Sequence, residues 1–284
     1  MNHNKRLKAM LLMSLLPFAV MVLSFELLPA LMMIVDSFRA DGGSHLTLRQ
    51  YFTALSNPYY LKAIWNSMVI SLYSTVAGIA VALLMAYSVT RLSERVRDGI
   101  ILFSNMTSNF AGVPLAFAYI ILLGNNGIIT ILLNKWGWDV FSGFNLYSWS
   151  GLALVYVYFQ IPLAILLLYP TYYGIKEQWI EASALLGASR MQFWRHIGLP
   201  ILLPGVTGTA SILFANSMGA YATAYALVGG NYNLLAIRIG SLIAGDVITR
   251  PQLGSALAVL LGLLMLGSMW LNERMMRRIR RDLT

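Results

Sequence analysis

Six long stretches of mostly apolar residues constrain this chain more than any other feature. An α-helix of about 20 apolar residues crosses the hydrocarbon core of a bilayer, and each stretch is close to that length or longer. Of the 284 residues, 58% are apolar and only 11% are charged, whereas soluble domains carry roughly 25% charged residues. The sequence therefore predicts an all-α, polytopic membrane helix bundle with six transmembrane helices, at Ala9–Val35, Trp65–Thr90, Ile100–Leu123, Leu146–Pro170, Ile201–Val228 and Gly254–Leu271.

The distribution of basic residues predicts the orientation of these spans. Most of the 20 Lys and Arg residues lie before the first span, after the second and fourth spans, or after the sixth. Because cytoplasmic loops carry an excess of Lys and Arg, both termini are expected in the cytoplasm. The first apolar stretch is longer than the core of a signal peptide, roughly 7–15 residues, and is expected to remain as a span. Residues 1–284 are then expected to form a single transmembrane domain.

Residue content also argues against several kinds of site. Cys is absent and the three His residues are scattered, so neither a thiolate nucleophile nor a metal site is expected. The basic residues flank apolar runs and do not alternate with aromatic residues on a solvated face, so nucleic-acid binding is not expected. The sequence contains no GxxxxGK[ST] phosphate loop, so we expect no cofactor on this chain and no ATP hydrolysis by it.

The segment between the fourth and fifth spans, residues 171–200, carries the signals of two short helices joined by a tight turn. Residues 177–186 are helix formers, and Gly187 suits the left-handed position that ends a helix. Ser189 with Gln192 three residues later is a capping-box pattern, and Pro200 favours the start of the fifth span. The first helix would present small side chains that allow close approach and leucines that supply apolar area: Ala182, Ser183, Ala184, Leu185 and Leu186.

This loop resembles the EAA motif of type I ABC importer permeases. Glu181-Ala182-Ser183 is followed by Gly187, and Ile197 with Leu199-Pro200 ends the motif, with Ser183 in place of the usual alanine. The motif stands before the penultimate span, as the family requires. The resemblance covers nearly the whole chain, because the six predicted spans extend over most of it. The implied coupling residues are Glu181, Ala182, Ser183, Ala184, Leu185, Leu186, Gly187, Ile197, Leu199 and Pro200.

The resemblance implies a permease subunit of the bacterial inner membrane that works by alternating access. Residues 171–200 would be a cytoplasmic coupling loop seated on a separate ATPase dimer, which would bind ATP and Mg²⁺. A second permease subunit, identical or a sister, and an external solute-binding protein are the other implied partners. The sequence looks closest to the polyamine, phosphonate and ferric-iron branch, although many members carry an acidic residue about where Ala220 stands. An amphipathic helix at the lipid interface, anchored by Trp179 and Trp194, is the alternative interpretation of the loop.

Two polar stripes are candidates for a substrate path. Asn105 and Asn109 follow a helical period in the third predicted span, together with Gly112. In the fifth predicted span the polar positions are Asn216, Ser217, Tyr221 and Tyr225. Polar groups facing lipid are costly, so these side chains are expected to face protein or water. They would either surround a small polar or cationic solute or form hydrogen bonds between helices.

In the second predicted span, a stripe of small residues favours close helix packing. Its members are Ser67, Ser71, Thr75, Gly78 and Ala82.

A secondary transporter that does not use ATP is the alternative function. It would be expected to carry several membrane-buried charges and inverted repeats. Glu26 is the only ionisable residue deep within a predicted span, and the sequence has no convincing internal repeat. A membrane-embedded enzyme would need paired carboxylates or a nucleophile beside a base, and the sequence pattern supplies neither.

Overall fold

The computed structural model describes residues 13–43, 45–137, 144–245 and 249–282. Within these ranges the regular elements are helices, apart from one isolated antiparallel bridge between Arg39 and Leu46. The predicted helical fold with six spans is confirmed, because six helices are long and apolar enough to cross a membrane. They are Met13–Ser37, Pro58–Thr90, Val113–Lys135, Trp149–Tyr172, Arg190–Met218 and Pro251–Arg277.

The chain divides into two compact units, and each is described by itself. The first contains Met1–Leu61 and Arg238–Leu260, and the second contains Lys62–Ile237 and Leu261–Thr284. The unit boundaries fall within three helices, namely α4 (Pro58–Thr90), α13 (Leu235–Ala244) and α14 (Pro251–Asp282).

In the first unit, the first span includes η1 (Leu23–Leu27) and α2 (Leu28–Ser37), and α3 (Arg49–Ser56) follows a short loop. Glu26 lies in η1 with its side chain exposed. Asp41 in the loop accepts hydrogen bonds from Gln50 Nε2 over 2.8 Å and from Arg250 Nε over 3.0 Å. These bonds tie the loop to α3 and to the residue that precedes α14.

The second unit is built around α8 (Trp149–Tyr172). Both α5 (Glu94–Ser108) and α11 (Leu199–Met218) pack against this helix. A Cβ atom at position 78 would lie 3.0 Å from the Cβ atom of Gln160, so glycine permits a close approach of α4 to α8. The packing prediction for α4 is confirmed, because the whole small-residue stripe is buried: Ser67, Ser71, Thr75, Gly78 and Ala82.

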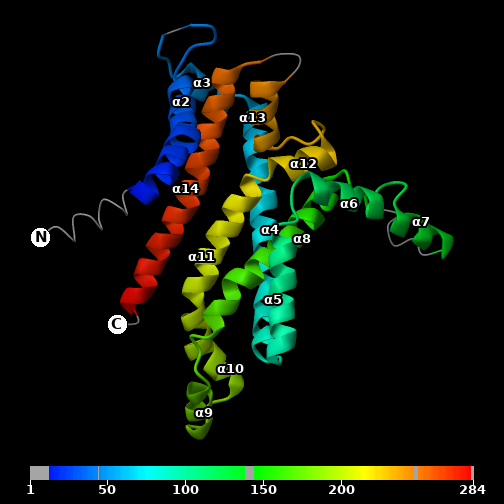
Figure 1. Ribbon diagram of the computed structural model, residues 1–284, viewed down its shortest axis with the longest axis vertical. Helices are drawn as coiled ribbons and strands as arrows, with labels where there is room; N and C mark the ends of the chain where they lie inside the picture. The colour runs from blue at the N-terminus through cyan, green and yellow to red at the C-terminus, as the bar shows by residue number, and fades with distance from the viewer. Residues whose placement is uncertain (1–12, 44, 138–143, 246–248, 283–284) are drawn as a thin grey trace, which may run out of the picture. The chain divides into compact units, whose positions relative to one another are not determined.

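The remaining helices of the second unit gather at the two ends of α8 and α11. In Figure 1, α9 (Glu177–Leu185) and α10 (Arg190–Phe193) lie at one end. At the other end α6 (Val113–Leu123) packs against α12 (Tyr221–Val228), and α7 (Ile128–Lys135) follows α6.

The predicted third span, Ile100–Leu123, is wrong as a single helix. α5 ends at Ser108, and α6 begins only at Val113. Gly112 has φ of 76°, a conformation that residues with a Cβ rarely adopt, and Pro114 has no N–H to continue the helical hydrogen bonds. The segment that is long and apolar enough to span is Val113–Lys135.

The predicted fifth span, Ile201–Val228, also has the wrong bounds. Its helix begins at Arg190 and passes through η2 (Trp194–Gly198) into α11, so Pro200 lies inside the span and not at its start. It ends at Met218, and α12 is a separate helix. Between them the Tyr221 N–H donates to the Gly219 carbonyl over 2.7 Å, a tight turn that the helical hydrogen-bond pattern does not contain.

Candidate functional site

The segment 171–200, which we call the docking loop, closes its first helix with hydrogen bonds between close neighbours. After α9, the Gly187 N–H donates to the Ala184 carbonyl over 3.0 Å, and the Ala188 N–H donates to the Ser183 carbonyl over 3.0 Å. This pair of bonds is the Schellman motif, which requires a residue in the left-handed conformation. Gly187 supplies it with φ of 80°.

The second helix of the docking loop begins with the predicted capping box. The Gln192 N–H donates to Ser189 Oγ over 3.3 Å, and the Ser189 N–H donates to Gln192 Oε1 over 2.7 Å. The two-helix turn predicted from Gly187, Ser189 and Gln192 is therefore confirmed.

The tip of the docking loop is apolar and open to solvent. Leu185 is 89% exposed and Leu186 is 88% exposed, and Met191 beside them is also exposed. Isolated leucines are common on protein surfaces, but two nearly fully exposed leucines beside the exposed Ala182 and Ala184 form a patch that a partner would cover. The sequence analysis missed Met191, although its helical position next to the turn is a usable signal.

Ser183 and Glu181 of the motif differ in burial and in their partners. Ser183 is buried, and its Oγ donates to the Ile180 carbonyl over 2.8 Å, so the serine adds no unsatisfied polar group to the loop. Glu181 is exposed, and no ion pair involves it within the described part of the chain.

The end of the motif lies beside α9, across a hollow that both line. Ile197 lines a hollow of about 410 Å³ together with Ala182 and Leu186 of the tip. Gly198 is buried, and a Cβ atom there would lie 2.4 Å from the Trp194 ring, so glycine makes room for the indole. Leu199 is exposed and Pro200 is partly buried. The motif thus joins the docking loop to the helix of the fifth span.

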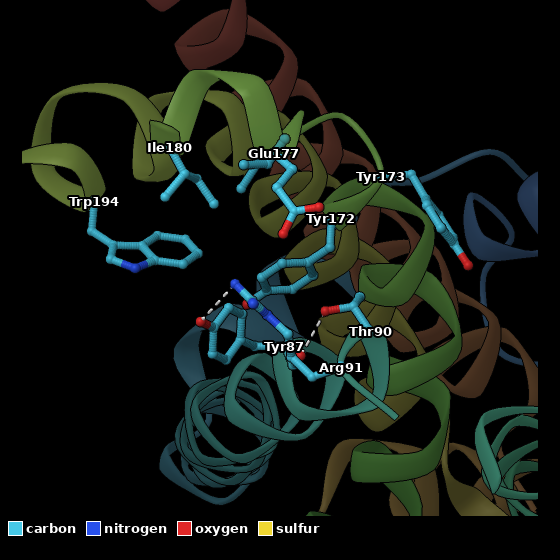
Figure 2. Close-up of a pocket in the computed structure, with 9 residues that line it drawn as sticks. Tyr87, Thr90, Arg91, Tyr172, Tyr173, Glu177, Ile180 and Trp194 are labelled. Atoms are coloured by element: carbon cyan, nitrogen blue, oxygen red, sulfur yellow. Dashed lines mark hydrogen bonds between the residues drawn. The ribbon is translucent and has the colours of Figure 1, made fainter. Parts of the chain in front are cut away.

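A cavity of about 290 Å³ lies between the docking loop and the ends of α4 and α8. Figure 2 shows that aromatic rings surround much of it, and that the Arg91 and Glu177 side chains also line it. Trp194 packs edge-on against Tyr87 with ring centroids 5.4 Å apart. Trp194 is therefore part of this wall, while Trp179 is exposed and lies 5.9 Å from the Lys176 ammonium.

The predicted path residues of the fifth span separate into two groups. Ser217 is buried, and its Oγ lies 3.1 Å from Ser74 Oγ of α4, which is a contact between helices. Asn216 is exposed, and its Nδ2 donates to Gln160 Oε1 over 3.3 Å. Gln160 is fully buried and donates to the Leu213 carbonyl over 2.7 Å. The sequence analysis missed Gln160, although it is the one amide side chain of α8.

The tyrosines and asparagines form two separate exposed pairs. Tyr221 and Tyr225 stack with ring centroids 5.4 Å apart, but the break before α12 removes them from the helical stripe of Ser217. Asn109 Nδ2 donates to the Asn105 carbonyl over 2.8 Å at the end of α5. Among the described residues, no hydrogen bond or ring contact joins the asparagine pair to the tyrosine pair.

The two helix breaks are bound to other helices by side-chain hydrogen bonds. The Gly112 N–H donates to Thr223 Oγ1 of α12 over 2.8 Å. Tyr156 of α8 donates its hydroxyl to the Ala220 carbonyl over 3.2 Å. The bond from Gly112 holds the start of α6 to α12, and the bond to Ala220 holds the start of α12 to α8.

Comparison with known proteins identifies the family. The family model of the binding-protein-dependent transport system inner membrane component matches residues 78–281. The chain belongs to this family. With its six apolar helices, it is a multi-pass protein of the inner membrane.

Curated relatives of this family member are permease proteins. One is the putative ferric transport system permease protein FbpB 1 of Haemophilus influenzae, 27% identical over 92% of this chain and 41% of its own length. The chain spans about two fifths of that relative and of a second ferric permease from Actinobacillus pleuropneumoniae, of which it covers 38%. The spermidine/putrescine permease PotB of Haemophilus influenzae is 25% identical, with 85% of each chain covered.

Solved structures share the fold of this family member. A chain of a bacterial ABC transporter involved in alginate import matches with a TM-score of 0.72 and 17% identity, over 97% of this chain and 98% of that one. A chain of the inward-facing MetNI methionine ABC transporter matches with a TM-score of 0.57 and 18% identity, over 77% and 95%. These likenesses extend over most of the chain.

Proposed function

We propose that this chain is the permease subunit of an ATP-driven, binding-protein-dependent importer of a small polar solute. The docking loop carries this proposal, because it presents Leu185 and Leu186 almost fully exposed next to small residues at the spacing of the EAA motif. A separate ATPase dimer covers this tip and supplies ATP hydrolysis with bound Mg²⁺. Both termini and the docking loop then lie in the cytoplasm, on the side that the basic residues favour.

The local geometry suggests how movement of the ATPase reaches the membrane. One helix, Arg190–Met218, runs from the docking loop into the fifth span. Ile197 of this helix lines one hollow with Ala182 of α9, and the Schellman motif and the capping box hold the turn between α9 and α10. Closure of the ATPase dimer would displace the loop as one body and move α11 against α8. That movement is the alternating-access step of the proposal.

A second permease subunit and an external solute-binding protein complete the proposed assembly. The ferric relatives have room for a second segment of this size, because this chain covers only 41% and 38% of them. The polyamine relative has no such room, since 85% of it is covered. We propose that this chain pairs with a second permease subunit, identical or a sister.

The exposed polar pairs are the proposed lining of the solute path. Tyr221 and Tyr225 offer phenolic rings and hydroxyls, and Asn105 and Asn109 offer amides at the other break. Asn216, which is held by the buried Gln160, adds a further amide. Ferric iron, polyamines and sulfate are the solutes named for relatives, and all are small and polar.

The docking proposal is tested by measuring uptake and co-purification with the ATPase. Gly187→Pro would distort the end of α9, and Ala182→Arg would place a long charged side chain where close approach is needed. We expect both variants to lose most uptake and ATPase binding while the membrane helices stay folded. Ser93→Arg, in the exposed loop between α4 and α5, is the control and should behave as the wild type. Normal transport by both loop variants would contradict the proposal, as would ATP-independent uptake by the purified chain.

The path proposal is tested at the stacked tyrosines. Tyr221→Phe keeps the ring and removes the hydroxyl, so reduced uptake with normal assembly indicates hydrogen bonding to the solute. Tyr221→Ala should reduce uptake further if the ring face contributes to solute binding. Because the chain contains no Cys, Tyr221→Cys would place a single thiol in it, and a water-soluble reagent should label it in one conformational state more than in the other. Wild-type uptake by the Phe and Ala variants without any labelling of the Cys variant would assign the pair to packing.

A further inference from the structure

The cavity beside the docking loop lies at the level where two spans end. Thr90 and Tyr172 are the last residues of the spans Pro58–Thr90 and Trp149–Tyr172, and both line the cavity. Ends of transmembrane helices lie in the headgroup layer, where Tyr and Trp are enriched. The volume of about 290 Å³ is at the small end of ligand pockets, roughly 300–1,000 Å³. The cavity therefore has room for a headgroup.

Arg91 is an exposed side chain that lines this cavity, and within the described ranges its one hydrogen bond to another residue's side chain is to Tyr87. Its guanidinium lies 5.4 Å from the centre of the Tyr87 ring, and its Nη2 donates to the Tyr87 hydroxyl over 3.4 Å. An arginine side chain has five N–H donors in a planar fork. A fork fixed by an aromatic ring and open on its remaining edges is suited to a phosphate group.

Glu177 brings the opposite charge to the same cavity. Within the described part of the chain, no ion pair joins Glu177 to Arg91, although Figure 2 shows both side chains in the cavity. The rings of Tyr172 and Trp194 complete the wall, with centroids 6.1 Å and 5.4 Å from that of Tyr87. Aromatic faces beside a carboxylate attract an ammonium group.

The two charges together select the chemistry of the occupant. A phosphate without an amine would meet the Glu177 carboxylate as a like charge, and an amine without a phosphate would meet the Arg91 guanidinium. A small molecule that carries both groups avoids both conflicts. A phosphoethanolamine group does so, because two carbons separate its ammonium from its phosphate.

We propose that this cavity binds the phosphoethanolamine headgroup of a membrane phospholipid. Arg91 holds the phosphate, and Glu177 with the Tyr172 and Trp194 rings holds the ammonium. The level of the span ends favours a lipid as the source over a free phosphoethanolamine. A lipid bound there connects α9 of the docking loop with the ends of α4 and α8, so bilayer composition would act on the loop directly.

The test measures which lipid stays with the full-length chain. The chain is reconstituted in nanodiscs with equal amounts of phosphatidylethanolamine and phosphatidylglycerol. It is then ejected from the nanodisc at low collision energy, and native mass spectrometry measures the mass of the chain with its retained lipids. We expect the wild type to retain the ethanolamine lipid preferentially. Glu177→Gln should lower that preference about tenfold, the ratio of roughly one charge-assisted hydrogen bond, and Arg91→Gln should reduce retention of both lipids. Glu94→Gln and Arg95→Gln, exposed and outside the cavity, are the matched controls.

Three outcomes would overturn the proposal. Equal retention of the two lipids by the wild type would do so, as would equal effects of the cavity variants and their controls. The third is displacement of the lipid by free O-phosphoethanolamine at equal affinity, which would assign the site to a soluble ligand. If Arg91 and Glu177 instead form a direct ion pair that closes the cavity, the wild type should retain the two lipids equally. The measurement involves neither ATPase nor transport, so its result is independent of the docking test.

Discussion

The docking loop satisfies its irregular backbone with local hydrogen bonds, whereas the paired helix breaks add hydrogen bonds to distant helices. In the docking loop every such hydrogen bond joins residues at most five positions apart, as from Ala188 to Ser183. At the breaks, Gly112 bonds to Thr223 and Tyr156 bonds to Ala220, across 111 and 64 positions of the chain. The loop therefore keeps its shape when it is displaced, whereas the breaks keep theirs only while α6, α8 and α12 stay packed. Substitutions in the loop should change coupling, and substitutions at the breaks should change folding.

The largest expected loss of stability comes from Gly112→Ala. An added Cβ would force the left-handed backbone at φ of 76° into strain that costs about 1–3 kcal/mol. The thermal unfolding temperature of the purified chain in detergent should fall clearly. Gly99→Ala, in α5 with open space around the added Cβ atom, is the control and should be neutral or slightly stabilising. If the two substitutions lower the unfolding temperature equally, the backbone conformation at the break is not what makes Gly112 necessary.

Thr223→Val should have the next largest effect. Valine has nearly the shape of threonine but leaves the partly buried Gly112 N–H without its acceptor, which costs about 1 kcal/mol. The unfolding temperature should fall by less than for Gly112→Ala. Thr171→Val is the comparison, because the Thr171 hydroxyl only donates to Leu168 of its own helix. If the two threonines respond alike, the contact between the breaks contributes nothing beyond local bonding.

Ser189→Ala should show a smaller and strictly local effect. Loss of the side-chain cap costs a helix about 1 kcal/mol, and here the cost should appear as faster hydrogen exchange at the Gln192 amide. Global unfolding should not change, because the loop makes these bonds with itself. Ser93→Ala is the matched control, since Ser93 stands at the start of α5 without a side-chain cap bond. A global loss of stability in Ser189→Ala would contradict the independence of the loop.

The smallest effect is expected at Asp41, where charge closes a loop of the first unit. Burial alone would raise the pKa of this carboxyl, but hydrogen bonds from Arg250 and Gln50 outweigh it and lower the pKa below the ordinary value of 3.8. A carboxylate with a lowered pKa stabilises the fold fully above the unfolded-state pKa, and the contribution is lost as pH falls through the folded-state pKa. The wild type should lose stability relative to Asp41→Asn between about pH 5 and pH 3. If the difference in stability between the wild type and Asp41→Asn stays constant across that range, the charge of Asp41 does not contribute to stability.

The docking loop was predictable from sequence because its signals act over a few residues. Gly187, Ser189 and Gln192 each indicate a specific cap, and the structure forms both caps where the sequence places them. The breaks were not predictable in the same way. The sequence analysis placed Gly112 in a polar stripe of one continuous span, because the acceptor for its N–H lies in α12 and no local pattern connects the two.

The expected helical stripe from Ser217 to Tyr225 is interrupted for a related reason. A helical period extrapolates from Ser217 to Tyr221 only if the helix continues, and it ends at Met218. Gln160 was missed because a buried amide is recognised by its partners, and these lie in α11. Span number, by contrast, depends on length and hydropathy alone, and it was predictable.

The π-helical turn η2 determines how far the docking loop is rotated about the helix axis relative to the fifth span. A π-turn holds one residue more than an α-helical turn, and one residue corresponds to a rotation of about 100° around the axis. The five residues Trp194–Gly198 therefore decide which side of α11 meets α8 for a given direction of the loop. Loss of that one residue would leave both helices intact and aim the loop away from its partner, so the length of this turn is as much a part of the docking surface as its side chains.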